Sequence, residues 1–224
     1  APSGKEVTLT LVVTGDARID TDYTLLKTMT IPIGTSLVSI SLDSVDDTLN
    51  ENDETVIINI DTVVNGVKGP LPTGQQQAAM VTIINNDPAP TVTLSVGTDT
   101  GNIVENGGTT TVTATLSATS AFDVTVSLVK TGLATEGVDY TLGTEISIAA
   151  GTQAKAITLA SIDDSLNEIG ETVIIDINAV INGEELGTQT QTVTILNDDG
   201  VPTVSLSVAR VSIDEDVGTT TTEF

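Results

Sequence analysis

The stretch that decides the fold is residues 163–183, which read DDSLNEIGETVIIDINAVING. After an acidic opening, apolar and polar residues alternate, so that Val173, Ile175 and Ile177 share one face. Strict alternation predicts a β-strand with one face in a core. The strand ends at Asn182-Gly183, a pair that a type I′ hairpin turn favours because both central positions need a positive φ.

The same stretch occurs earlier in the chain, as DDTLNENDETVIINIDTVVNG at residues 46–66. The two copies are 163 − 46 = 117 positions apart. The tetrapeptide Asp-Tyr-Thr-Leu at 22–25 returns at 139–142 with the same offset, since 139 − 22 = 117. Further along, Thr91–Val96 matches Thr203–Val208 at an offset of 203 − 91 = 112. Repetition of this kind indicates a tandem array of similar domains.

The matches predict three units that differ in completeness. Residues 1–88 form a repeat that lacks its first strands, residues 89–200 form a complete repeat, and residues 201–224 begin a third. Proline and glycine punctuate both junctions, as expected of short, stiff linkers. We therefore expect the chain to be a window on a longer array.

Alternation within the complete unit predicts seven strands. They are expected at 91–96, 109–117, 123–130, 145–149, 154–162, 171–181 and 188–196. Seven short strands in about 110 residues are typical of an antiparallel sandwich. The expected fold class is all-β, as tandem seven-stranded antiparallel sandwiches of the Greek-key or immunoglobulin-like type.

Composition limits the classes of partner. Lys and Arg number 7 against 31 Asp and Glu in 224 residues, a formal net charge of −24. Such a chain repels the phosphates of nucleic acids and anionic membrane surfaces. No apolar run is long enough to span a bilayer. Neither nucleic acid nor membrane insertion is therefore expected.

The acids are expected to gather at one end of each sandwich. Successive strands reverse direction, so alternate loops and the end of the last strand lie at the same end. In the complete unit this end carries eight carboxylates: Glu105, Asp139, Asp163, Asp164, Glu168, Glu171, Asp198 and Asp199. In the first unit it carries six: Asp22, Asp46, Asp47, Glu51, Glu54 and Asp87.

Clustered carboxylates predict a cation site. Close like charges repel by several kcal/mol at low effective dielectric, and Ca²⁺ accepts roughly 6–8 oxygen ligands in flexible geometry. Mg²⁺ demands octahedral geometry, and Zn²⁺ is poorly served by a chain with no His or Cys. The alternative for each acid alone is a turn residue that bonds its own backbone, but clustering and repetition together favour Ca²⁺ ligation.

Three segments of the complete unit, taken together, resemble the Calx-beta motif: Gly137–Tyr140, Ile162–Val173 and Val193–Asp199. The motif is found in sodium–calcium exchanger regulatory domains, in an integrin beta subunit and in large bacterial surface proteins. The resemblance implies Ca²⁺ at the distal loops, held by the acids at the positions given above. The motif's terminal acidic triplet reads Asn197-Asp198-Asp199 here and Asn85-Asn86-Asp87 in the first unit, so the first unit is expected to bind more weakly.

These observations predict a Ca²⁺-binding, Ca²⁺-stiffened repeat segment of a long cell-surface or secreted adhesin-type protein, located outside the cell or on its surface. The expected partners are calcium ions, neighbouring repeats and a cell-surface adhesion target. The alternative is a regulatory Ca²⁺-sensor module of a membrane transport or signalling protein, although sensors usually comprise one or two unlike domains. An enzyme is not expected, because the chain has no His or Cys and its acids crowd together instead of flanking a cleft.

Overall fold

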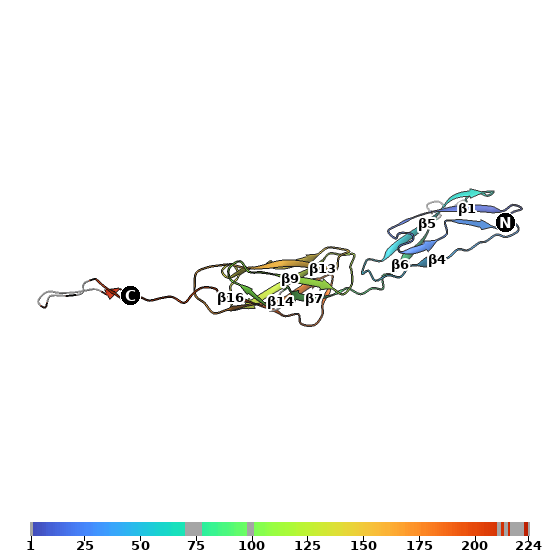
Figure 1. Ribbon diagram of the computed structural model, residues 1–224. Coiled ribbons are helices and arrows are strands. Elements are labelled where there is room, and N and C mark those ends of the chain that lie inside the picture. The colour runs from blue at the N-terminus through green and yellow to red at the C-terminus, as the bar shows by residue number, and fades with distance from the viewer. Residues whose placement is uncertain are drawn as a thin grey trace.

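The computed structural model describes residues 2–69, 78–97, 101–209, 212, 215 and 222–223. Those residues form eighteen strands and no helix, so the described part of the chain has no helix that could cross a membrane. Figure 1 shows two groups of strands in succession, β1–β6 and β7–β16, and a tail that leaves the far end of the second. We call these groups the first unit and the second sandwich. The predicted all-β fold class is confirmed.

The second sandwich consists of two five-stranded sheets. One has the order β12 (Glu145–Ile148), β10 (Val124–Gly132), β14 (Glu171–Ile181), β16 (Gln191–Leu196) and β8 (Asn102–Val104). The other has the order β11 (Tyr140–Thr141), β13 (Ala154–Ser161), β9 (Thr109–Leu116), β7 (Thr91–Val96) and β15 (Glu184–Glu185). Neighbours in these orders are distant in sequence, as expected of Greek-key connections.

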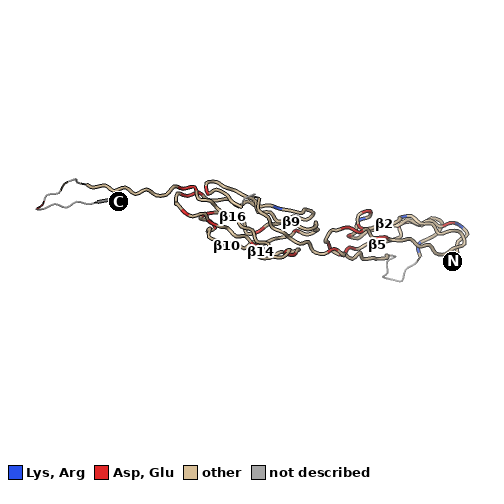
Figure 2. The backbone as a smooth tube through the Cα atoms, turned by 60° about the horizontal axis from the view of Figure 1, so that its bottom comes forward, with Lys and Arg blue, Asp and Glu red and all other residues tan. Residues whose placement is uncertain are grey.

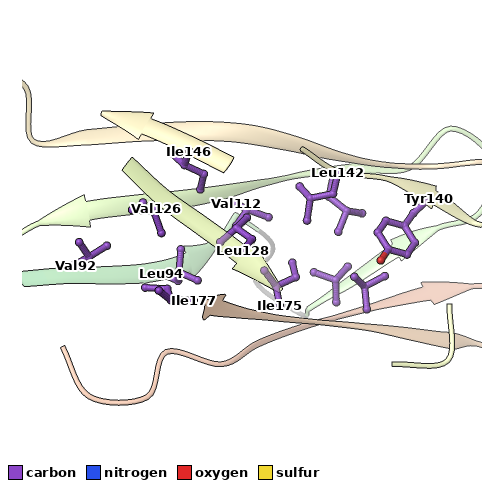
Figure 3. Packing of buried hydrophobic residues seen from close by; sticks show 14 of the residues in the cluster. Val92, Leu94, Val112, Val126, Leu128, Tyr140, Leu142, Ile146, Ile175 and Ile177 are labelled. Carbon is purple, nitrogen blue, oxygen red and sulfur yellow. The ribbon is translucent and has the colours of Figure 1, made fainter. Parts of the chain in front are cut away.

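The core of the second sandwich lies between its two sheets. Figure 3 shows Val92, Leu94 and Val112 of one sheet facing Val126 and Ile175 of the other. All five side chains are buried. The alternation in the sequence produces this core, because every second residue of a strand points to the same face. The described residues of this core include one aromatic, and Val, Ile and Leu fill most of the rest.

The seven predicted strands of this unit are all present. Three short strands were not predicted: β8, β11 and β15. Two of them pair in parallel, β8 with β16 and β15 with β7, so the sandwich is not purely antiparallel. The predicted type I′ turn is wrong: Asn182 has a φ of 60°, but Gly183 has no positive φ, and the chain crosses to the other sheet.

The first unit repeats part of this architecture. Its strands are β1 (Val7–Gly15), β2 (Tyr23–Leu25), β3 (Thr28–Ile31), β4 (Leu42–Ser44), β5 (Glu54–Val64) and β6 (Ala78–Ile83). They form a sheet of order β3-β1-β5-β6 and a pair β2-β4. The offset of 117 relates β1 to β10 (124 − 7) and β5 to β14 (171 − 54). Even the register shift recurs, after Thr10 and after Ser127.

The two cores differ in extent. In the first unit the buried hydrophobic cluster comprises Tyr23, Leu25 and Val56, with other apolar side chains only partly buried around it. In the tail, Ser207–Val208 (β17) pairs with Thr222–Glu223 (β18). The division of the chain at residues 88 and 200, and the assignment of the tail to a third repeat, stay predictions.

Candidate metal centres

The loop between β13 and β14 lies at the end of the second sandwich from which the tail leaves. Asp164 Oδ1 accepts a hydrogen bond from the Leu166 N–H at 2.7 Å, which turns the chain locally. The Asn167 side-chain amide donates to the Asp199 carbonyl oxygen at 2.8 Å. The loop is therefore tied to the segment that follows β16.

Glu105, Asp164 and Asp199 form the first carboxylate group. Each offers one oxygen, and the three oxygens lie within 4.8 Å of one another. Glu105 follows β8, is only 8% exposed, and donates its N–H to the Leu196 carbonyl at 2.9 Å. Burial raises the pKa of Glu105, and the charges of Asp164 and Asp199 raise it further. Three separate segments thus converge on one point.

Asp139, Glu168 and Glu171 form the second group, with oxygens again within 4.8 Å. The Thr135 N–H donates to Asp139 Oδ2 at 2.6 Å, which fixes the carboxylate in its turn. Burial raises the pKa of Glu171, followed by the hydrogen bond to Asp139 and its charge. A cavity of about 10 Å³ is lined by all three acids and by Glu105, so the two groups adjoin.

Asp22, Glu51 and Glu54 form the third group, in the first unit. They are the counterparts of the second group, because 139 − 22, 168 − 51 and 171 − 54 all equal 117. The pKa of Glu54 is raised to about 7, first by burial and then by its hydrogen bond to Asp22. A cavity of about 30 Å³ touches all three acids, together with Asp47 and Asp87.

These groups have no cationic side chain to balance them. In the described part of the chain the one salt bridge joins Lys130 to Glu136, and neither belongs to a group. Glu54 Oε2 and Asp199 Oδ2 are buried and have no hydrogen-bond partner. A buried carboxylate oxygen without a partner is costly, so protonation or contact with a cation would stabilise each of them.

Five of the fourteen predicted ligands lie outside the three groups: Asp46, Asp47, Asp87, Asp163 and Asp198. Asp47 Oδ1 accepts from the Leu49 N–H at 2.7 Å, as expected of a turn residue. Asp46 Oδ1 lies 3.4 Å from the Asn86 amide. Asp198 and Asp163 add charge that raises the pKa of Asp199, after the larger effect of burial. Ligation by any of the fourteen stays a prediction.

Two kinds of supporting residue were not predicted. The Asn50 amide donates to the Asp87 carbonyl at 3.0 Å, as Asn167 does to Asp199. The Leu-Asn-Glu tripeptide that occurs at 49–51 and again at 166–168 is the sequence feature that could have predicted this pair of hydrogen bonds. Asp16 also raises the pKa of Glu54, but its counterpart at 16 + 117 = 133 is a leucine, so repetition gave no hint of it.

The acidic end of the first unit contacts the second sandwich. The Asn50 carbonyl accepts hydrogen bonds from the Ala121 N–H at 2.9 Å and the Ser120 hydroxyl at 3.4 Å. Ser120 is 1% exposed. Figure 2 shows acidic residues gathered around this junction and at the far end of the second sandwich. We call these two hydrogen bonds the junction contact.

No protein-family model matches the chain, and no curated protein matches it. The chain is similar to solved structures, among them the apo-form Calx CBD1 domain, at 21% identity and a TM-score of 0.42, covering 50% of this chain and 100% of that one. Another is CBD12 from CALX1.2, at 18% identity and a TM-score of 0.37, covering 86% and 88%. The third is the calcium binding domain CBD12 of CALX1.1, at 21% identity and a TM-score of 0.35, covering 79% and 69%.

Proposed function

We propose that the chain binds Ca²⁺ at its three carboxylate groups, and that it is a Ca²⁺-stiffened repeat segment of a long adhesin-type protein, secreted or on the cell surface. The observation that carries the binding is the convergence of acids to within 4.8 Å at equivalent positions in both units. Glu54 Oε2 and Asp199 Oδ2 also lack a hydrogen-bond partner although they are buried. A divalent cation is the partner that such oxygens fit.

The donor set favours Ca²⁺ over other metals. The chain has no His and no Cys, so every side-chain ligand is an oxygen, which suits Ca²⁺ or Mg²⁺ and not Zn²⁺. Each group supplies three carboxylates from separate segments of the chain, and Asn197 lines the same cavity as Glu105. Ca²⁺ tolerates irregular sets of roughly 6–8 oxygens, whereas Mg²⁺ demands an octahedron.

The position of two groups supports the stiffening role. Asp199 directly precedes the Gly200–Pro202 segment that leads into the tail, so an ion held with Glu105 and Asp164 would fix the start of that segment. Glu51 follows Asn50, whose carbonyl makes the junction contact. The first of these groups therefore adjoins the chain that leads out of the second sandwich, and the other adjoins the contact between the first unit and the second sandwich.

Calorimetric titration of chelator-stripped protein with Ca²⁺ tests the binding, with Mg²⁺ as the control metal. We expect saturable Ca²⁺ binding, and a ligand at a hundred times its Kd should stabilise the fold by about 2.7 kcal/mol. A melting temperature that EDTA leaves unchanged at low ionic strength would contradict Ca²⁺ binding. Small-angle scattering tests the spacer role separately: if Ca²⁺ binds but leaves the flexibility between the units unchanged, the stiffening role is wrong.

A further inference from the structure

The turn that carries Asp139 occurs in both units with the same main-chain hydrogen bonds. We call residues 135–140 the Asp139 turn and residues 18–23 the Asp22 turn, since 135 − 117 = 18. In each turn the Asp carboxylate accepts a hydrogen bond from the N–H four residues earlier. The N–H of the same Asp donates to the carbonyl of that earlier residue at 2.9 Å in both units. The backbone therefore gives the two turns the same local structure.

The side chains next to the two turns differ. In the first unit they are apolar: Val13 of β1 and Ile19 of the Asp22 turn are both partly buried against the core. In the second sandwich the same positions, 13 + 117 = 130 and 19 + 117 = 136, are Lys130 and Glu136. These two side chains form the one salt bridge in the described part of the chain. An ion pair therefore replaces an apolar pair.

Lys130 contacts the chain on both sides of Asp139. Its ammonium group donates to Glu136 Oε1, three residues before Asp139, and to the Leu142 carbonyl at 2.9 Å, three residues after it. Lys130 belongs to β10, where it pairs with Ile175 of β14, and its side chain is only 8% exposed. A charge that is so far buried needs its hydrogen-bond partners. The ammonium group therefore holds both flanks of the Asp139 turn on β10.

A groove of about 580 Å³ lies beside these contacts, lined by Lys130, Thr135, Glu136 and Tyr140, among others. A valine at position 130 would not reach either acceptor. Glu136 is 45% exposed, so its carboxylate would be free to turn towards water. The Asp139 turn would then keep its main-chain hydrogen bonds and lose its side-chain contact with β10.

We propose that Lys130 is a positioning residue for the second carboxylate group. By holding the Asp139 turn on β10, it keeps the Asp139 carboxylate close to Glu168 and Glu171, with oxygens within 4.8 Å of one another. This inference rests on the proposed Ca²⁺ binding at that group. Neither Lys130 nor Glu136 belongs to the group, so the ion pair acts on the metal through the turn. Residues that orient metal ligands from outside the coordination shell typically contribute about 10–100-fold to metal affinity.

Charge and position predict opposite effects of Lys130→Val. The substitution removes a positive charge and leaves Glu136 unpaired, so the attraction of this region for a cation increases. Loss of positioning weakens Ca²⁺ binding instead. We expect the affinity of the second group to fall about tenfold, which the change of charge cannot produce. Lys155→Val is the matched control, because Lys155 is exposed on β13 and its loss changes the charge equally. It should not weaken binding.

Nuclear magnetic resonance of the full chain measures both effects at single residues. In EDTA, hydrogen exchange of the Asp139 amide should become at least about tenfold faster in Lys130→Val. Exchange in β14 and in the Asp22 turn should stay unchanged, which shows that the fold is intact. During a Ca²⁺ titration, the Asp139 and Glu168 amides report the affinity of the second group. The Glu51 amide reports the third group and is the reference within the same molecule.

The double variant Lys130→Val/Glu136→Ile tests the mechanism by rescue. It places the apolar pair of the first unit in the second sandwich and leaves the formal net charge at −24. Because Val13 and Ile19 adjoin the same kind of turn, the double variant should restore both slow exchange at Asp139 and the Ca²⁺ affinity of the second group.

Three results would overturn the positioning role. They are unchanged Asp139 exchange in Lys130→Val, faster exchange with no loss of Ca²⁺ affinity, and a double variant that binds as weakly as the single one. An original chain whose Asp139 amide does not respond to Ca²⁺ would contradict the proposed function, and with it the effect on affinity. The exchange rates in EDTA would still decide whether Lys130 holds the turn.

Discussion

Single residues that occupy equivalent positions in the two units act as controls for each other. Asp164 and Asp47 each accept a hydrogen bond from the N–H two residues later, at 2.7 Å. Only Asp164 also lies within 4.8 Å of two other acids, Glu105 and Asp199. Replacing either residue disturbs the same local bond, so a difference in Ca²⁺ binding between the variants reports on the carboxylate group.

Asp164→Asn should lower the Ca²⁺ affinity of its site by about tenfold or more, equivalent to about 1.4 kcal/mol, because it removes one ligand charge. Asp47→Asn should have a smaller effect. The two affinities are measured by calorimetry on otherwise identical chains. Equal effects would contradict the ranking of the two units.

The raised pKa of Glu54 predicts a dependence of stability on pH. Its folded pKa of about 7 lies above the ordinary value of 4.5, so the folded state binds the proton more tightly than the unfolded state. In EDTA this contribution is fully present below about pH 4.5 and is lost as the pH rises through 7. Thermal melts across this range should show the loss, and Glu54→Gln should flatten it.

Glu6→Gln is the control substitution, because Glu6 is exposed and lies outside the three carboxylate groups. With saturating Ca²⁺ the profile should reverse, since the ion binds the deprotonated carboxylates. A metal-free profile that rises between pH 4.5 and 7 would contradict the burial of Glu54.

At the scale of elements, alternation predicted the strands of four or more residues in the second sandwich, because a period of two is visible over that length. The strands that were missed have two or three residues, and β8 and β15 are held by parallel partners far away in sequence. The Asn182-Gly183 pair predicted a type I′ turn that does not form, and the reason is physical. A Cβ on Gly183 would lie 3.0 Å from the Pro90 carbonyl oxygen, so glycine serves a close approach there and not a positive φ.

Part of the candidate site was also predicted from the sequence. The reversal of direction between successive strands predicted that the nine acids which converge lie at the same end of their units. That prediction depends only on the direction of each strand. It could not separate them from Asp46 or Asp47, since the orientation of a side chain within a loop depends on local hydrogen bonds. The sequence did not predict the junction contact either. Its acceptor is the main-chain carbonyl of Asn50, and the identity of a side chain does not indicate which group its main-chain carbonyl will bind.

The junction contact should restrict the angle between the two units. Asn50→Ala removes the amide that holds the loop to Asp87, and Ser120→Ala removes one donor, each at a cost of about 0.5–1.5 kcal/mol. Asn167→Ala removes the equivalent bond in the second sandwich and serves as the control.

Spin labels give the measurement, since the chain has no native Cys. Cysteines at the exposed residues Thr24 and Thr158 place one label on each unit. The distance distribution should broaden in Asn50→Ala and in Ser120→Ala, and stay unchanged in Asn167→Ala. Unchanged distributions in the first two variants would show that the contact does not orient the units.

At the scale of the whole molecule, the two unequal cores predict two unfolding transitions. Val56 and Val173 are counterparts and both are fully buried, but Val56 belongs to a much smaller cluster. Calorimetry should show the first unit melting at the lower temperature. Val56→Ala should lower only the first transition and Val173→Ala only the second, each by about 2 kcal/mol. One shared transition that both variants shift would show that the units unfold together.

The parallel pairing of β8 with β16 decides how the second sandwich responds to tension. The chain enters at β7, next to the first unit, and leaves after β16 at the opposite end. A pull on both ends drives Asn102–Val104 and Thr194–Leu196, which pair in register, past each other in opposite directions. Their hydrogen bonds are then loaded in shear and must break together, instead of opening one after another. Force spectroscopy should record an abrupt rupture with little prior extension, and gradual lengthening at low force would contradict it. A segment built in this way would resist extension until these hydrogen bonds rupture.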